Sequence, residues 1–172
     1  ISGSLESFLS CATMLDEQLP LMLMTAHPDN EPILSYAQGS PERSALKAEL
    51  NRQLSEVVEI PCIIGGKEVR TGNIVKQVVP HNHGHVLAEV HIAGEKEIAD
   101  ACDAAVSAQR EWIEMGLEAR CEIFERCADL LAGPWRMKSN ASTMLNQSKT
   151  AYQAEIHVAC ELIDFWRFNC HY

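Results

Sequence analysis

Residues 61–93, PCIIGGKEVRTGNIVKQVVPHNHGHVLAEVHIA, decide the fold that this sequence predicts. CIIGGKEVRTG reads as a short strand, a turn at Gly65–Gly66 and a return strand, because paired glycines supply the backbone angles of a tight hairpin turn. NIVKQVVP continues the β character up to Pro80, HNHGH reads as a turn built on Asn82 and Gly84, and the alternation in VLAEVHIA indicates another strand. We therefore predict a small β meander over residues 61–93.

The sequence ahead of the meander predicts one helix and an irregular segment. Ser40 suits an N-cap and Pro41 suits the first helical position, where a missing N–H is harmless. An apolar stripe at helical spacing predicts a helix over residues 40–60, ended by Pro61. The members of this stripe are Leu46, Leu50, Leu54, Val57 and Val58. Residues 1–39 carry weak structural signals and are predicted to form an irregular N-terminal segment.

The sequence after the meander, residues 94–172, is predicted to be helical. One helix runs from Glu95 to Gly116, a second follows and breaks at Gly133–Pro134, and a last one runs from about Ala151 to Asn169, after a less regular stretch. The apolar stripes of the three helices are Ile98, Cys102, Ala105, Gln109 and Trp112; Leu117, Cys121, Phe124, Ala128 and Leu131; and Ala151, Ala154, Val158, Leu162 and Phe165.

This order of elements does not close a parallel α/β sheet. The chain supplies few strands for its helices to cover, yet each helix has an apolar face that must be buried somewhere. The helices therefore either form a bundle of their own or meet partner surfaces in another segment or chain. We predict a mainly helical fold with a small β meander and an incomplete sheet.

Composition narrows the classes of partner. A formal net charge of -10 disfavours a binder of nucleic acid or of anionic membranes, because phosphate-rich partners require a concentrated basic surface. No run is long and apolar enough to predict a membrane span. The seven cysteines form no C-x-x-C pair and most lie in helical patterns, which favours a reducing compartment. Residues 1–28 contain acids but no Lys or Arg, so neither a secretory signal nor a transit peptide is readable.

Six segments, in order and at matching spacing, carry a family resemblance. They are SPERSALKAEL, IPCIIGGKEVRTGN, PHNHGHVLAEVHIA, AQREWIEM, EARCEIFERCADLLAGP and NQSKTAYQAEIHVACELIDFWRFNCHY. Over about residues 30–172 the chain resembles the N-terminal third of the mitochondrial pyrroline-5-carboxylate dehydrogenase family. The resemblance implies an α/β, aldehyde dehydrogenase-like fold, a location in the mitochondrial matrix, and NAD-dependent oxidation of glutamate semialdehyde in proline breakdown.

The resemblance also implies what each part of the chain contributes. Residues 61–93 would supply strands of the oligomerisation region, and residues 94–172 would supply helices packed on the cofactor domain. The family's catalytic cysteine, glutamate base and nicotinamide-binding strands belong to later segments, so no catalytic, cofactor-binding or metal-binding residue is assigned here. Independently, Gly65–Gly66 lies in a hairpin with no helix after it, which disfavours a phosphate-cradling role.

Two hypotheses about function remain open. The chain is either a structural part of such a dehydrogenase, inactive alone, or a free-standing truncated paralogue that acts as a non-catalytic interaction protein. Both predict exposed apolar faces on the helices after Glu95, and hence a homo-oligomer, a complex with a related dehydrogenase subunit, or a larger assembly. An intact mass near 19.1 kDa for the native protein would favour the second hypothesis.

Glu155 is the one candidate site residue, and it rests on the resemblance. It matches a family glutamate that lies close to the substrate pocket. The alternative is a solvated or structural helix carboxylate, which we favour for the isolated chain because the other walls of the pocket are missing. Imidazoles are common zinc ligands, but the run of histidines brackets a turn and has no cysteine or acid at ligand spacing, so no metal site is predicted. The histidines are His81, His83, His85 and His91.

Other conspicuous residues have structural interpretations. Arg167, close to Asn169, could pair with Asp164 or with an acid on another element, but a cation favoured by the helix dipole is the simpler interpretation. The aromatic residues are predicted to pack or to form interfaces; they are Trp112, Trp135, Phe165, Trp166 and Phe168.

The loop before Lys149 departs from the family pattern. Asn146 and Ser148 stand where the family carries glycines, and glycine permits positive φ. This departure indicates a loop whose backbone conformation is under weaker constraint, as in a copy of the enzyme that no longer catalyses.

Overall fold

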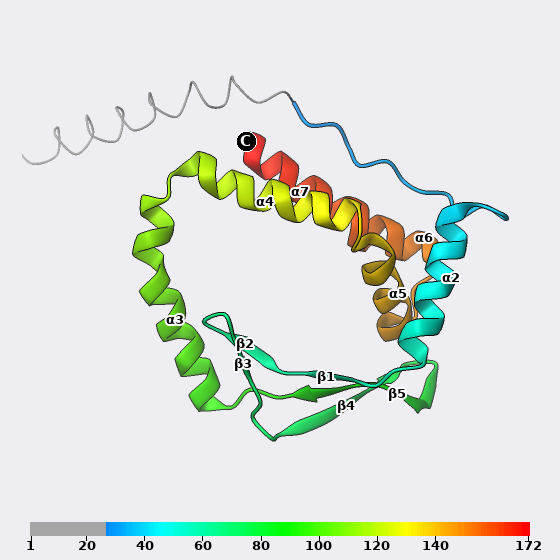
Figure 1. Cartoon of the computed structure of the whole chain (residues 1–172), viewed down its shortest axis with the longest axis horizontal. Coiled ribbons are helices and arrows are strands. Elements are labelled where there is room, and N and C mark those ends of the chain that lie inside the picture. Colours follow the sequence, from blue (N-terminus) through cyan, green and yellow to red (C-terminus); the bar gives the residue numbers. More distant parts are fainter. Residues whose placement is uncertain (1–26) are drawn as a thin grey trace, which may run out of the picture.

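The computed structural model describes residues 27–172 as an open arrangement of helices joined through a small β region (Figure 1). The elements in chain order are α2 (Pro41–Leu54), β1 (Val58–Ile60), β2 (Cys62–Ile64), β3 (Lys67–Val69), β4 (Ile74–Val79), β5 (Asn82–His91), α3 (Glu95–Glu114), α4 (Leu117–Ala132), α5 (Arg136–Gln147), α6 (Ala151–Ala154), the π-helix η1 (Glu155–Cys160) and α7 (Glu161–His171). The predicted fold class is confirmed: the chain is mainly helical, and its sheets are small and incomplete.

The β region is two small sheets, so the prediction of a single meander is wrong in detail. The predicted hairpin at Gly65–Gly66 is confirmed, but β2 and β3 pair only with each other. In the second sheet β5 lies between β4, which is antiparallel, and β1, which is parallel. The turn between β4 and β5 lies at residues 80–81 instead of on Asn82 and Gly84, because a register shift pairs Val79 directly with Asn82.

The helix before the sheet begins as predicted and ends earlier. The Ser40 hydroxyl accepts a hydrogen bond from the Arg43 N–H at 3.3 Å, and Pro41 occupies the first helical position. The prediction that the helix reaches residue 60 is wrong. Ser55 caps the last turn through its backbone N–H, and Val58 already belongs to β1. Valines fit a strand as readily as a helical stripe, and here pairing with β5 decides between them.

The later helices break at the predicted glycines. Gly116, with φ +82°, separates α3 from α4, and Gly133 follows the end of α4. The stretch predicted to be less regular is the 12-residue helix α5. The last predicted helix contains η1, which the sequence did not reveal. Because a π-turn holds more residues than an α-turn, it rotates the face that follows. Leu162 and Phe165 of the predicted stripe are therefore 38% and 63% exposed, while Ile163 is buried.

Three small apolar clusters hold the helices and the sheet together. The first joins α4, η1 and α7 and consists of Ala128, Leu131, Ala159 and Ile163. The second joins α2 and α5 to the segment before α2 and consists of Tyr36, Leu46 and Ala141. The third joins the sheet to α5 and consists of Val79, Leu87 and Leu145. Each cluster is much smaller than the core of a complete domain of this length.

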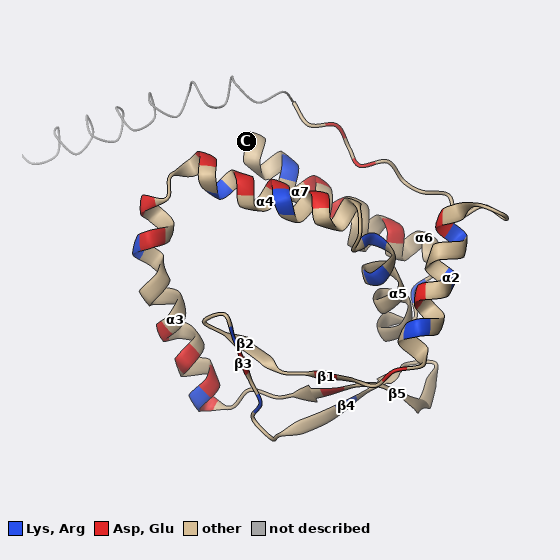
Figure 2. Cartoon of the chain, viewed as in Figure 1, with Lys and Arg blue, Asp and Glu red and all other residues tan. Residues whose placement is uncertain are grey.

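Helix α3 buries none of its residues, so the predicted exposed apolar face after Glu95 is confirmed. Its exposed apolar side chains include Ile98, Val106 and Ile113, with Val106 at 71%. Figure 1 shows α3 standing apart from α2 and α5, and Figure 2 shows acidic residues along its length. Within residues 27–172, none of the helices has the length and apolar character that a bilayer crossing demands.

Candidate functional site

An extended segment, residues 27–39, precedes α2 and lies across the later helices; we name it the N-terminal strap (Figure 1). The Glu31 N–H donates to a carboxylate oxygen of Asp164 at 2.7 Å, and the Leu34 N–H donates to Glu155 Oε1 at 2.8 Å. The Arg43 guanidinium of α2 donates to the Tyr36 carbonyl at 3.2 Å. Although it is irregular, as predicted, the strap is fixed by side chains of α2, η1 and α7.

Glu155 lies at the centre of this arrangement, where η1 points its carboxylate at the strap. It is fully buried. Besides the Leu34 N–H, it accepts hydrogen bonds from Tyr36 Oη at 2.6 Å, from Asn140 Nδ2 at 2.8 Å and from the Arg136 guanidinium. The solvated interpretation of this glutamate is therefore wrong, and the structural interpretation fits its surroundings. A role beside the substrate pocket stays a prediction.

Arg136 and Glu31 extend the network to the strap and to α7. Arg136 is buried and donates to Glu155, to Glu31 and, at 2.7 Å, to the Pro32 carbonyl. The second oxygen of Glu31 accepts from Arg167 at 2.7 Å, so one strap carboxylate bridges two arginines. Arg167 also reaches Asp129 at 3.3 Å. Pairing with acids on other elements is thus confirmed for Arg167, so the helix dipole is not its only favourable interaction.

The electrostatics keep Glu155 ionised. Burial alone would raise the pKa of Glu155, but the hydrogen bonds from Arg136, Tyr36 and Leu34 outweigh it, so the pKa is lowered. Burial and the neighbouring carboxylate raise the pKa of Tyr36. Burial likewise raises the pKa of the nearby Cys160 thiol to about 11. A carboxylate with all these donors is an anchor for the strap.

This lowered pKa predicts acid sensitivity. Glu155 contributes stability that is fully present above its unfolded pKa, about 4.3, and is lost as the pH falls through its lower folded value. We therefore expect the free energy of unfolding to fall below about pH 4, and to fall less steeply in Glu155→Gln. Urea unfolding at a series of pH values measures both slopes. Identical slopes in the two proteins would contradict the assignment.

Two of the four histidines weighed as metal ligands in the sequence, His81 and His91, contact separate partners. His91 is buried in β5, where its Nδ1 accepts from the Gly72 N–H at 3.1 Å and its Nε2 contacts Glu59 at 2.9 Å. His81 contacts the Ser148 hydroxyl at 2.7 Å. Within residues 27–172, no three His, Cys, Asp or Glu side chains are grouped as metal ligands would be.

The loop before Lys149 has left-handed backbone at one of its two departures from the family. Ser148 has φ +55° and ψ 29°, a conformation that glycine adopts at lower cost. Asn146 is helical and donates to the Ser142 carbonyl at 3.0 Å, so positive φ is not required there. The weaker constraint on the backbone conformation of this loop stays a prediction.

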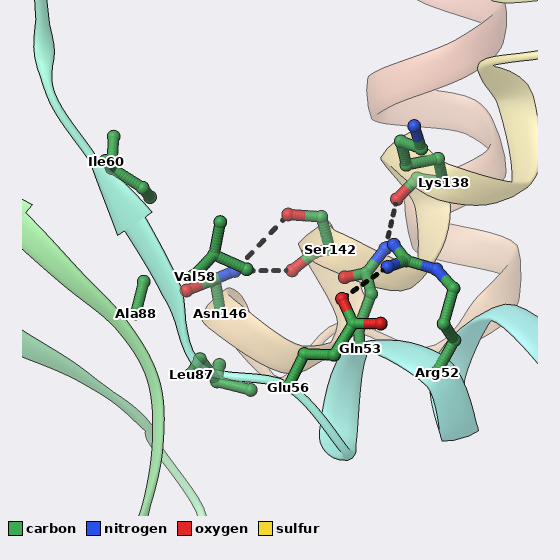
Figure 3. Close-up of a pocket in the computed structure, with 10 residues that line it drawn as sticks. All are labelled: Arg52, Gln53, Glu56, Val58, Ile60, Leu87, Ala88, Lys138, Ser142 and Asn146. Atoms are coloured by element: carbon green, nitrogen blue, oxygen red, sulfur yellow. Dashed lines mark hydrogen bonds and ion pairs between the residues drawn. The ribbon is translucent and has the colours of Figure 1, made fainter.

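A groove of about 390 Å³ lies where the end of α2 meets β1, β5 and α5 (Figure 3). Val58 and Leu87 give it an apolar side, while polar residues opposite are already paired. Arg52 binds Glu56 at 2.7 Å, and Gln53 donates to the Lys138 carbonyl at 3.0 Å. The C-terminal end of α2 faces the groove, and its partial negative charge is unfavourable to a phosphate.

NAD is the cofactor that the resemblance implies. Its pyrophosphate requires a glycine-rich turn that leads into a free helix N-terminus. Gly65–Gly66 leads into β3 instead. At the start of α3, the Glu97 carboxylate already accepts the Gly94 N–H at 2.9 Å, and Glu95 adds a second negative charge there. Neither the Gly65–Gly66 turn nor the start of α3 therefore fits the pyrophosphate of a dinucleotide.

Comparison with known proteins matches the chain to one family throughout most of its length. The sequence pattern of the aldehyde dehydrogenase family matches residues 68–172. The human mitochondrial delta-1-pyrroline-5-carboxylate dehydrogenase is 45% identical over 143 residues, which are 83% of this chain and 25% of the human protein. The enzyme of the same name from Agaricus bisporus is 46% identical over 144 residues, which are 83% of this chain and 26% of that protein.

Solved structures agree with the sequence relatives. The crystal structure of the Mycobacterium tuberculosis delta-pyrroline-5-carboxylate dehydrogenase bound with NAD has a TM-score of 0.83 and 44% identity, covering 86% of this chain and 28% of that one. The Thermus 1-pyrroline-5-carboxylate dehydrogenase with bound NAD has a TM-score of 0.78 and 28% identity, with the same coverage of 86% and 28%. The chain thus spans about a quarter of the length of these relatives.

Proposed function

The chain belongs to the aldehyde dehydrogenase family, and on this premise we propose that it contributes the N-terminal part of an NAD-dependent pyrroline-5-carboxylate dehydrogenase. That enzyme would oxidise glutamate semialdehyde to glutamate in proline breakdown, in the mitochondrial matrix. The chain's own role would be structural. Its β strands would join an oligomerisation region, its helices would cover the cofactor domain, and the chain alone would be inactive.

The exposed apolar face of α3 is the observation that carries this proposal. A 20-residue helix that buries nothing gains too little from its own sequence to be held in place, since most helical stability in proteins comes from tertiary packing. The relatives have about three quarters of their length beyond the matched part, which is ample material to cover α3. The remaining segments of such an enzyme would also supply its NAD site.

A chimaeric enzyme tests the proposal. Residues 30–172 of this chain replace the matched segment of the human relative, and NADH formation is measured with glutamate semialdehyde. We expect an active chimaera, in which Val106→Asp lowers activity more than about tenfold, because the new charge is buried against the covering segment. Ser107→Asp adds the same charge on another face of α3 and is expected to retain activity. An inactive, well-folded chimaera, or equal effects of both substitutions, would count against the proposal.

The free-standing interaction protein remains the alternative. An intact mass near 19.1 kDa for the native protein would favour it, and a much larger mass would favour the part of an enzyme. In both cases the apolar faces of α3 require a partner. The partner would be a second copy, a related dehydrogenase subunit or a larger assembly.

A further inference from the structure

We propose that Cys121 and Cys170 are a thiol pair that oxidises to a disulfide joining α4 to α7. Cys121 lies in the first turns of α4 and Cys170 in the last turn of α7. The Cys170 sulfur lies 3.6 Å from the Cys121 carbonyl oxygen, and the Cys121 sulfur lies 3.9 Å from the Cys170 carbonyl oxygen. Each side chain therefore extends over the backbone of the other residue, so the two sulfurs share one interhelical gap.

The packing of α4 on α7 holds the two cysteines opposite each other. The helices lie side by side with opposite directions (Figure 1). Further along the same contact, Ala128 of α4 packs in one buried cluster with Ile163 of α7. Small and branched side chains in that cluster bring the backbones close and fix the register. A disulfide demands such proximity, because it tolerates only a narrow range of backbone separations.

The pair is also accessible to a reagent. Both cysteines are half-buried, and both line a hollow of about 350 Å³ beside Trp112 and Phe124. Burial, together with the neighbouring Cys121, raises the pKa of Cys170 to about 12. The resting state is therefore a thiol, and oxidation is slow at neutral pH. The other described cysteines have different surroundings: Cys102, for example, is exposed on α3.

The chemistry is thiol–disulfide exchange with a small-molecule disulfide such as oxidised glutathione. One cysteine loses its proton and attacks a glutathione sulfur, which releases one glutathione thiolate and leaves a mixed disulfide. The second cysteine, deprotonated in turn, attacks the protein sulfur and displaces the second glutathione. Two protein thiols and one glutathione disulfide thus become one protein disulfide and two glutathione thiols. The two electrons pass to glutathione, and no other oxidant is required.

Equilibration in glutathione redox buffers tests the pair. The purified 172-residue protein is incubated over a range of reduced-to-oxidised ratios, alkylated and mapped by mass spectrometry. We expect one cross-linked peptide pair containing Cys121 and Cys170, lost in both Cys121→Ser and Cys170→Ser and retained in the control Cys102→Ser. The oxidised protein is expected to melt roughly 5–10 °C higher than the reduced one, since the bond closes a long loop.

Incubation in urea is the second arm of the experiment and separates native pairing from random pairing. In the unfolded chain, Cys121 is expected to pair with several cysteines, so selective pairing without urea reports the fold. The proposal is overturned if both cysteines remain fully alkylated at the most oxidising ratio. It is equally overturned if the native and urea-treated proteins give the same mixture of cross-links. The cross-links of the chimaeric enzyme are mapped in the same way, so the result for the cysteine pair does not depend on whether the chimaera has dehydrogenase activity.

Discussion

Arg136→Met is expected to lower the free energy of unfolding by about 3–5 kcal/mol, because it leaves a buried carboxylate without its cation. Glu155 is fully buried and receives two hydrogen bonds from this guanidinium. The substitution also removes donors from Glu31 and from the Pro32 carbonyl. The loss is large beside the total stability of about 5–15 kcal/mol of a typical domain. Urea unfolding followed by circular dichroism measures it.

Arg52→Met is the matched control for this experiment. Arg52 also binds two glutamates, but its side chain is 43% exposed, and surface ion pairs contribute about 0–1 kcal/mol. The double variant Arg136→Met with Glu155→Gln should recover part of the lost stability, since it removes the unpaired charge along with its partner. Equal losses for the two single arginine variants would contradict the assignment of a buried network.

Ile163→Ala is expected to cost about 3 kcal/mol, within the range for cavities left by large apolar side chains. Ile163 is completely buried among Ala128, Leu131 and Ala159, where the small neighbours leave little scope for collapse into the space. The same unfolding experiment measures the loss. Because this cluster joins α4 to α7, the substitution also weakens the contact between these two helices in the reduced protein.

The adjacent residue gives the control for Ile163. Leu162→Ala removes a side chain of the same size, but Leu162 is 38% exposed, and we expect a loss below about 1 kcal/mol in the isolated chain. A helix without the π-turn would bury Leu162, as its apolar stripe predicts. A larger loss for Leu162→Ala than for Ile163→Ala would therefore place η1 elsewhere in the chain.

Local signals predicted the helices better than the sheets. The breaks at Gly116 and Gly133 and the N-cap at Ser40 depend on the residue itself and its immediate neighbours. The parallel pairing of β1 with β5 joins Val58 to Ala88, 30 positions further along the chain, and a three-residue strand leaves too short a pattern to reveal it. The π-helix at Glu155 has no periodicity of its own, so the stripe beyond it was misplaced.

The buried network shows the same limit at the candidate site. Glu155 was singled out through the family resemblance, whereas Tyr36, Arg136 and Asn140 carried no signal. Their pairing with Glu155 is a tertiary fact: Tyr36 lies 119 positions away, on a strap without regular structure. A charged residue at the start of a helix is ordinarily predicted to face solvent, and the sequence carries no sign that Arg136 is buried.

The double bridge made by Glu31 has a consequence for the order of folding. Its two arginine partners lie 105 and 136 positions further along the chain. Contacts this distant in sequence form late, because the entropy of closing a long loop is lost before the contact is gained. On a ribosome, the strap emerges before α5, η1 and α7, and its network with Arg136, Glu155 and Arg167 is complete only when α7 has been synthesised. We therefore expect the first described segment of the chain to be the last to dock.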